Sequence, residues 1–150
     1  MNETQPSFSI EKLYVKDLSL EIPNAPQVFL EAESPQLDVQ VRNDATRFGE
    51  GLYEVVVTVT VTARAGDKTL FLAEAAQAGI FAIRGVPEGD MDPLLGIVCP
   101  TVVYPYVRET ISDLVIRGGF PPVVLAPMSF EALYAQRAEQ SAGPKIEVVQ

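Results

Sequence analysis

Apolar and polar residues alternate most regularly over residues 52–64, where one phase is apolar throughout. Alternation at period two with many β-branched residues predicts a strand that buries one face. Residues 65–68 then predict a hairpin turn, followed by a partner strand over residues 69–83. The apolar phase of the first strand consists of Tyr53, Val55, Val57, Val59, Val61 and Ala63.

The middle of the partner strand is made of small residues, namely Ala73, Ala75, Ala76, Ala78 and Gly79. Small side chains on a strand allow another surface to approach the backbone closely. The sequence therefore predicts that a second element packs tightly against this part of the sheet.

Two further strands are predicted before residue 52. Residues 8–22 alternate in two halves, and the phase slips near Lys16, which predicts a β-bulge there. The prolines in residues 23–26 end this strand, and residues 27–35 are expected to form an extended crossover that is unusually apolar for a loop. A short strand over residues 37–42 and a polar loop over 43–51 complete this half.

The second half of the chain has helical spacing. Asp92 and Pro93 predict a helix start, and apolar residues after Pro100 recur every three to four positions as far as Val115. Gly118 and Gly119 predict its end, and Ser129 is expected to cap a last helix that reaches about residue 141. Strands followed by helices predict an α+β fold, an antiparallel sheet covered by helices, in one domain over residues 1–150. The ends, residues 1–6 and 144–150, are expected to be flexible.

Composition narrows the classes of partner. Hydrophobic residues make up 47% of the chain, enough for a buried core, and the formal net charge is −9. An acidic chain is a poor match for nucleic acid or for anionic membranes, and a good match for a partner with a basic surface. The sequence has no signal-like N-terminus and no run of about 18 apolar residues, so we expect a cytoplasmic protein without direct membrane insertion.

Several catalytic chemistries are missing from the sequence. It contains no histidine and one cysteine, Cys99, so it offers no Ser-His-Asp or Cys-His site, no common zinc site and no internal disulfide. We expect a protein that is not an enzyme and that uses no metal or cofactor, with Cys99 as a buried structural residue. An enzyme built on carboxylates and tyrosines stays possible in principle, but the strand carboxylates here occupy polar positions of their pattern.

Five groups of segments, taken in order, carry a resemblance to a known family. They are YVKDLSLE (14–21) with PNAP (23–26) and Phe29; YEVV (53–56) with VTVTA (59–63); FLAE (71–74) with Gln77 and GIF (79–81); LG (95–96), CP (99–100) and YPY (104–106) with Arg108 and Glu109; and RGGFP (117–121), LAP (125–127) and FEAL (130–133). Over about residues 8–133 the chain resembles the SecB family of protein-export chaperones.

The resemblance implies a four-stranded antiparallel sheet with two helices packed on one side, assembled as a homotetramer that is a dimer of dimers. It also implies an ATP-independent holding chaperone, which binds unfolded secretory preproteins and delivers them to the SecA translocation ATPase. Burial of apolar surface without fixed geometry suits clients that share no sequence.

The resemblance also implies three groups of site residues. The SecA-binding residues are Asp17, Glu21, Leu72 and Glu74. The candidates for the substrate groove are Val28, Phe29, Leu30 and Tyr134. The oligomer interface would contain Ala73, Ala75, Gln77, Val103, Val107 and Ile111. Asp17 and Glu21 share a strand face, so their charges add and can steer a basic module.

The sequence departs from the family pattern at two places. Glu33 stands where the crossover often carries a tryptophan, and the final residues 145–150 are not acidic. Two alternative functions remain, a SecB-like chaperone of a toxin–antitoxin system and a carrier of a small apolar ligand. The set formed by Asp17, Glu21 and Glu74 favours export, and a ligand carrier would be a monomer or simple dimer with a bound lipid-like molecule.

Overall fold

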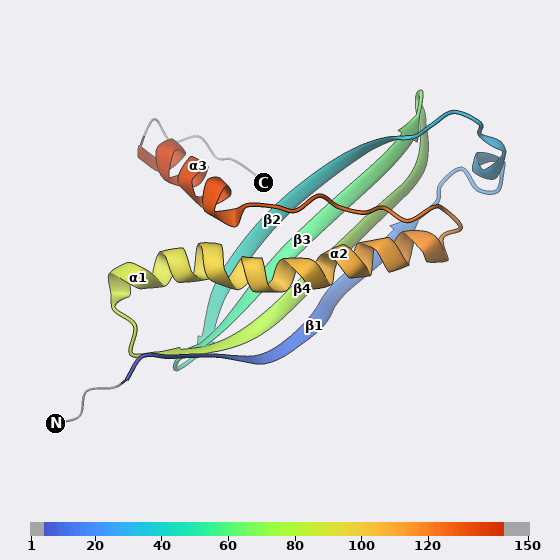
Figure 1. Ribbon diagram of the computed structural model, residues 1–150. Coiled ribbons are helices and arrows are strands. Elements are labelled where there is room, and N and C mark those ends of the chain that lie inside the picture. The colour runs from blue at the N-terminus through green and yellow to red at the C-terminus, as the bar shows by residue number, and fades with distance from the viewer. Residues whose placement is uncertain (1–4, 143–150) are drawn as a thin grey trace.

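The chain forms a two-layer structure, in which one twisted sheet carries all the helices on a single face (Figure 1). The computed structural model describes residues 5–142, so the predictions for residues 1–6 and 144–150 fall largely outside it. The sheet is antiparallel with strand order β1-β4-β3-β2. Its strands are β1 (Ser7–Glu21), β2 (Gln36–Gly49), β3 (Leu52–Ala65) and β4 (Lys68–Arg84).

The two central strands bear out the period-two prediction. In β3 the predicted apolar phase faces the helices, and Val55, Val57 and Val59 are fully buried. These residues pair with Gly79, Gln77 and Ala75 of β4 on the same face. We call this helix-covered side the inner face and the opposite side the outer face.

β2 is longer than predicted. Residues 43–49, expected as a polar loop, continue the strand to the turn, and Asn43 lies opposite Val57 of β3. The prediction was wrong because ladder hydrogen bonds join backbones and need no apolar side chains. An edge strand with solvent on one side can therefore be polar over much of its length.

The bulge predicted near Lys16 is present, as a register shift between Val15 and Asp17. A second shift lies between Ile10 and Lys12. The crossover was predicted to be extended, but Gln27–Leu30 forms a 3-10 helix. The N–H of Phe29 donates to the Pro26 carbonyl at 3.1 Å, and the proline φ suits the start of such a turn.

The helical half begins earlier than predicted. The helix α1 (Glu88–Pro93) continues through a π-helical turn (Leu94–Val98) directly into α2 (Cys99–Arg117). Asp92 therefore caps no helix, and Pro100 interrupts none. Pro100 directly follows the π-helical turn, at the second residue of α2, and the helix continues past it. Gly118 and Gly119 end α2 as predicted, and Gly119 adopts a left-handed φ of 89°.

The core lies between α2 and the inner face of β3 and β4. Val103, Val107 and Ile111 of α2 are fully buried there, against the small residues Ala73 and Ala75. The prediction that small strand residues permit a close approach is thus confirmed, with α2 as the approaching element. No helix within residues 5–142 combines the length and hydropathy needed to cross a bilayer.

The last helix, α3 (Phe130–Ala142), follows an extended link that runs beside α2 (Figure 1). Ser129 caps it as predicted, because its hydroxyl accepts the N–H of Ala132 at 3.1 Å. Phe130 is 2% exposed and packs edge-on against Tyr104 at 5.7 Å between ring centroids.

Candidate functional site

The four predicted SecA-binding residues lie together on the outer face, at one end of β1 and β4. Asp17, Ser19 and Glu21 of β1 stand opposite Ala76, Glu74 and Leu72 of β4, respectively. Glu74 lies diagonally across from both Asp17 and Glu21, and diagonal neighbours on paired strands are about 7–8 Å apart, so Glu74 joins the three carboxylates into one cluster. We call Asp17, Glu21, Leu72 and Glu74 the acidic patch.

The charge of the acidic patch is not compensated by neighbouring cations within residues 5–142. The described ion pairs join Lys16 to Glu54 and Arg117 to Asp113, and neither includes a patch carboxylate. Glu74 accepts a neutral hydrogen bond from Thr60 at 2.7 Å, which orients it without cancelling its charge. The patch therefore presents a negative, helix-free surface to solvent.

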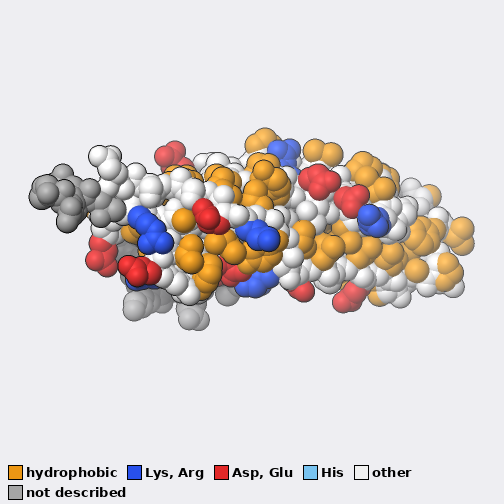
Figure 2. All heavy atoms as spheres, turned by 90° about the horizontal axis from the view of Figure 1, so that it is seen from below, with side chains coloured by type: hydrophobic (Ala, Val, Ile, Leu, Met, Phe, Trp, Pro, Cys, Tyr) orange, Lys and Arg blue, Asp and Glu red, His pale blue; other side chains and the backbone are white. Residues whose placement is uncertain are grey.

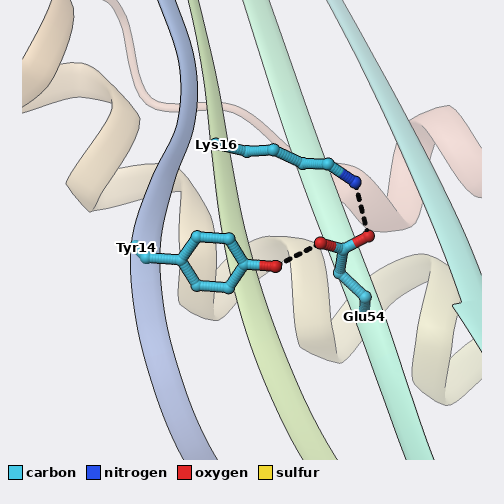
Figure 3. Close-up of polar contacts among 3 residues, drawn as sticks. All are labelled: Tyr14, Lys16 and Glu54. Carbon is cyan, nitrogen blue, oxygen red and sulfur yellow. Dashed lines mark hydrogen bonds and ion pairs between the residues drawn. The ribbon is translucent and has the colours of Figure 1, made fainter. Parts of the chain in front are cut away.

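A second polar cluster lies farther along the same face. Glu54 of β3 accepts hydrogen bonds from the Tyr14 hydroxyl and from the Lys16 ammonium, the latter at 2.8 Å (Figure 3). The hydrogen bonds from Lys16 first and Tyr14 second hold the pKa of Glu54 below its usual value. The hydrogen bond to Glu54 raises the pKa of Tyr14 to about 12, with smaller contributions from burial and from the Glu54 charge.

An apolar groove lies on the inner side, between β2 and the extended link before α3. It has a volume of about 570 Å³. Leu37 and Val39 are 47% and 42% exposed, because α2 covers the centre of the sheet and leaves this edge open. The groove is lined by Leu37, Val39, Gln40, Val41, Tyr104 and residues 123–128.

The link that forms one wall of the groove is tied to α2. The Tyr104 hydroxyl donates to the Ala126 carbonyl at 2.6 Å, and burial raises the pKa of Tyr104. Val123 and Leu125 point into the core, whereas Val124 is 78% exposed. The link is therefore held against α2 by Tyr104, Val123 and Leu125, and it presents the apolar side chain of Val124 to solvent.

The crossover residues proposed for the groove lie at the far end of the link. Val28 is buried, but Phe29 and Leu30 are 50% and 87% exposed. Phe29 stacks on Phe120 at 5.3 Å between centroids, just where α2 ends. Phe29 and Leu30 thus present adjacent apolar surface to solvent at this end of the link.

Tyr134 does not lie beside these crossover residues. Its ring rests on Gly96, where an added Cβ would come within 2.8 Å of the ring, and its hydroxyl donates to Asp92 at 2.8 Å. Figure 1 shows α3 and the crossover at opposite ends of the molecule. The structure thus separates Tyr134 from Phe29 and Leu30 within one chain, with the groove along the link between them.

The six residues predicted for the oligomer interface all lie inside one chain. Ala73, Ala75, Gln77, Val103, Val107 and Ile111 are 5% exposed or less, between β4 and α2. Gln77 is buried with a hydrogen bond from the Thr110 hydroxyl at 3.3 Å. These side chains leave no free surface for a second chain, so any effect of theirs on assembly would pass through the position of α2.

Exposed apolar side chains do occur along the free edge of the sheet. Phe8, Ile10, Val15 and Leu18 of β1 are each 39–46% exposed. Figure 2 looks at the molecule from the β1 side and shows hydrophobic side chains spread widely over this face, between scattered charges. An unpaired strand edge with apolar neighbours favours association with another chain.

Sequence reasoning did not propose the groove residues of β2 and the link as a site. In the sequence Leu37, Val39 and Val41 alternate with polar residues, which predicts a strand with one inward face but not that this face stays uncovered. No local signal distinguishes these three positions from core positions, because their exposure depends on where α2 lies over the sheet. Cys99 is buried as predicted, and burial raises the pKa of its thiol to about 12.

Comparison with known proteins agrees with this architecture. The family model described as preprotein translocase subunit SecB matches residues 1–141. A protein-export protein SecB of Methylobacillus flagellatus is 59% identical over 140 residues, which cover 93% of this chain and 89% of that protein. One of Chromobacterium violaceum is 58% identical over 140 residues, 93% of each chain.

A solved structure has a similar fold. It is a SecB-like chaperone of Mycobacterium tuberculosis in complex with a ChAD peptide from the HigA1 antitoxin, with a TM-score of 0.67 and 17% identity. The match covers 81% of this chain and 90% of that one, and at this identity it bears on the fold alone. The family match over nearly the whole chain, together with relatives above 50% identity, shows that this chain belongs to the SecB family.

Proposed function

We propose that this protein is an ATP-independent holding chaperone of the cytoplasm, which binds unfolded secretory preproteins and delivers them to the SecA ATPase. The observation that carries the proposal is the 59% identity, over 93% of the chain, to a relative named protein-export protein SecB. The two exposed surfaces, apolar on the inner side and acidic on the outer side, fit the two tasks of holding and delivery.

Holding uses the groove between β2 and the link, extended by the exposed crossover residues Phe29 and Leu30. Its walls are mostly aliphatic, and a client segment gains free energy by burying apolar side chains there, about 25 cal/mol per Å². Tyr134 belongs to this surface at the other end of the link. Weak contacts at several such grooves, acting on one long client, add through avidity.

Delivery uses the acidic patch. Three uncompensated carboxylates beside Leu72, on a sheet face that no helix covers, suit a partner segment that carries cationic side chains and an apolar one. Such a contact forms quickly and weakens as salt rises, which permits release after transfer.

Assembly as a dimer of dimers would cover the apolar edge of β1. A second copy is the occupant that suits an antiparallel edge strand, because the same row of N–H and C=O groups can pair with itself about a two-fold axis. The exposed side of α2, with Tyr106 and Ile116 at 47% and 51% exposure, is the surface for the second interface. Sedimentation velocity on the full chain tests this assembly, and a monomer at micromolar concentration would refute it.

The holding activity is tested by refolding a chemically unfolded secretory precursor with and without this protein, in the absence of ATP. We expect refolding to stall, and to resume when SecA is added. Val39→Asp places a charge in the groove at an exposed position and should abolish holding. Gln36→Asp adds the same charge to the same strand outside the groove, and serves as the matched control.

The delivery step is tested by SecA affinity. Glu74→Lys reverses one charge of the patch and should weaken SecA binding at least about tenfold, because it turns an attraction into a repulsion. Asp90→Lys makes the same charge change on the exposed α1 and should leave the affinity unchanged. Equal losses in both variants would show that only net charge matters, and would refute a docking site at the patch.

The toxin–antitoxin alternative has less support than export. The relatives named for export are 52–59% identical over most of the chain, whereas the solved SecB-like antitoxin chaperone is 17% identical. Binding of a small apolar ligand is not favoured either, because the groove is open along β2 rather than enclosed.

A further inference from the structure

The outer face of β1 separates its charges along the strand. Lys12 lies opposite Ile80 of β4, whereas Asp17 lies opposite Ala76. Glu54 of β3 pairs with Ile80 as well, so Lys12 and Glu54 share one row of the sheet. Rows four residues apart are about 13 Å apart along a strand, farther than the Debye length of about 8 Å at physiological salt.

Lys16 is the exception in this arrangement, because it directly precedes Asp17. The bulge between Val15 and Asp17 adds it as an extra residue of β1. A lysine ammonium on a flexible four-carbon stem can reach a carboxylate on the next residue when nothing holds it elsewhere. A cation there would compensate the acidic patch at its first residue.

Glu54 holds this cation away from the patch. The Lys16 ammonium lies 2.8 Å from one Glu54 oxygen, and the Tyr14 hydroxyl binds the other oxygen. Figure 3 shows Lys16 reaching across β4 toward β3, on the side of the sheet away from α2. The side chain of Glu54 is 18% exposed, against 50% for Lys16, so the carboxylate is the fixed partner and the lysine is the mobile one.

We propose that Glu54 is a positioning residue for the acidic patch, since it sequesters the Lys16 ammonium and so keeps the charges of Asp17, Glu21 and Glu74 free for a cationic partner segment. Tyr14 assists by fixing the orientation of the Glu54 carboxylate. The inference rests on the docking role proposed above for the patch.

A purely structural role for the cluster predicts something different. If Tyr14, Lys16 and Glu54 only tie β1 to β3 across β4, the loss of either ionic partner should have the same consequence. Losing both partners should then be no better than losing one. Sequestration predicts opposite effects. Without Glu54 the lysine becomes harmful to docking, and without Lys16 the glutamate is no longer needed.

The test uses Glu54→Gln, Lys16→Gln and the double variant in the full-length chain, with SecA affinity measured at low and at physiological salt. Glu54→Gln should weaken binding about three- to fivefold, the effect of one added surface ion pair, and more at low salt. Lys16→Gln should bind as the unaltered protein does or more tightly. The double variant should recover the affinity of Lys16→Gln, and a double variant as weak as Glu54→Gln would overturn the proposal.

A second measurement does not depend on SecA. Paired cationic and anionic nitroxide cosolutes broaden amide resonances according to the local electrostatic potential, here read at residues 17–21. Glu54→Gln should make that potential less negative, and the added Lys16→Gln should restore it. An unchanged potential in Glu54→Gln would overturn sequestration itself, whereas a changed potential with no SecA binding by the unaltered protein would overturn the docking role alone.

Discussion

The two faces of the sheet follow the same four strands and yet behave as different kinds of surface. On the inner face Val55, Val57 and Phe81 are fully buried beneath α2. On the outer face no helix covers the strands, and most side chains are threonines, small residues and charges, with Val56, Leu72 and Ile80 among them. The difference teaches that one layer of helices stabilises the fold, while partners can use the open outer face and the inner-side edge along β2 that α2 leaves uncovered.

The largest expected contrast between the faces is in stability. Phe81→Ala removes a fully buried ring from the inner face and should lower the free energy of unfolding by about 3–5 kcal/mol. Ile80→Ala, the adjacent residue on the outer face, is only partly buried and should lower it far less. Urea unfolding followed by circular dichroism, at one fixed protein concentration, measures both. Equal losses would refute the assignment of the core to one face.

A second prediction concerns how α3 is fixed over the inner side. A Cβ at Gly96 would lie 2.8 Å from the Tyr134 ring, so Gly96→Ala must displace the ring, at a cost of about 1–3 kcal/mol. Hydrogen exchange should then become faster in α3. Gly89→Ala is the control, because no atom lies within 4 Å of its added Cβ and alanine favours a helix. Unchanged exchange in Gly96→Ala would show that α3 is held elsewhere.

On the outer face the hydrogen bond between Tyr14 and Glu54 should be visible in the pH dependence of stability. The pKa of Tyr14 is raised to about 12, so the fold favours the neutral phenol. Its contribution is complete below the unfolded-state pKa of about 10 and is lost as pH rises through about 12. Tyr14→Phe should cost about 0.5–1.5 kcal/mol at neutral pH and should lack this alkaline loss.

Absorbance titration of tyrosinate measures the same group directly. The sequence contains five tyrosines, and the pKa values of Tyr104 and Tyr134 are also raised, so the difference between the unaltered protein and Tyr14→Phe isolates Tyr14. A difference curve centred near pH 10 would contradict the hydrogen bond to Glu54.

The last prediction concerns the rate at which a thiol reagent labels Cys99, a measurement that needs no change in the stability of the protein. Cys99 lies fully buried on the inner side, and burial raises the pKa of its thiol to about 12. A thiol reagent at pH 8 should therefore react slowly with Cys99 in the folded protein. After unfolding in urea, Cys99 should react at the ordinary rate of a free cysteine. In folded Phe81→Ala it should react faster than in the unaltered folded protein. Rapid labelling of the folded protein would show that the inner face opens without global unfolding.

For β3 the sequence by itself determined which positions face inward, because side chains of a regular strand alternate between the two faces. Period two located the apolar phase of β3, the slip at Lys16 revealed the bulge, and Gly118 and Ser129 marked helix ends. It failed for residues 43–49, whose strand depends on pairing with β3, and for the helix start at Glu88.

Only the tertiary structure decided which distant residues meet. Lys16 contacts Glu54, 38 residues away in the sequence, because the strand order places only β4 between β1 and β3. No local sequence pattern fixes that order. The same holds for the groove, because Val39 was a plausible core residue until the position of α2 left its strand uncovered. The alternation of side chains between the two faces of a strand is a local property of the chain. Strand order and helix placement, in contrast, follow from packing the whole sheet against one long helix.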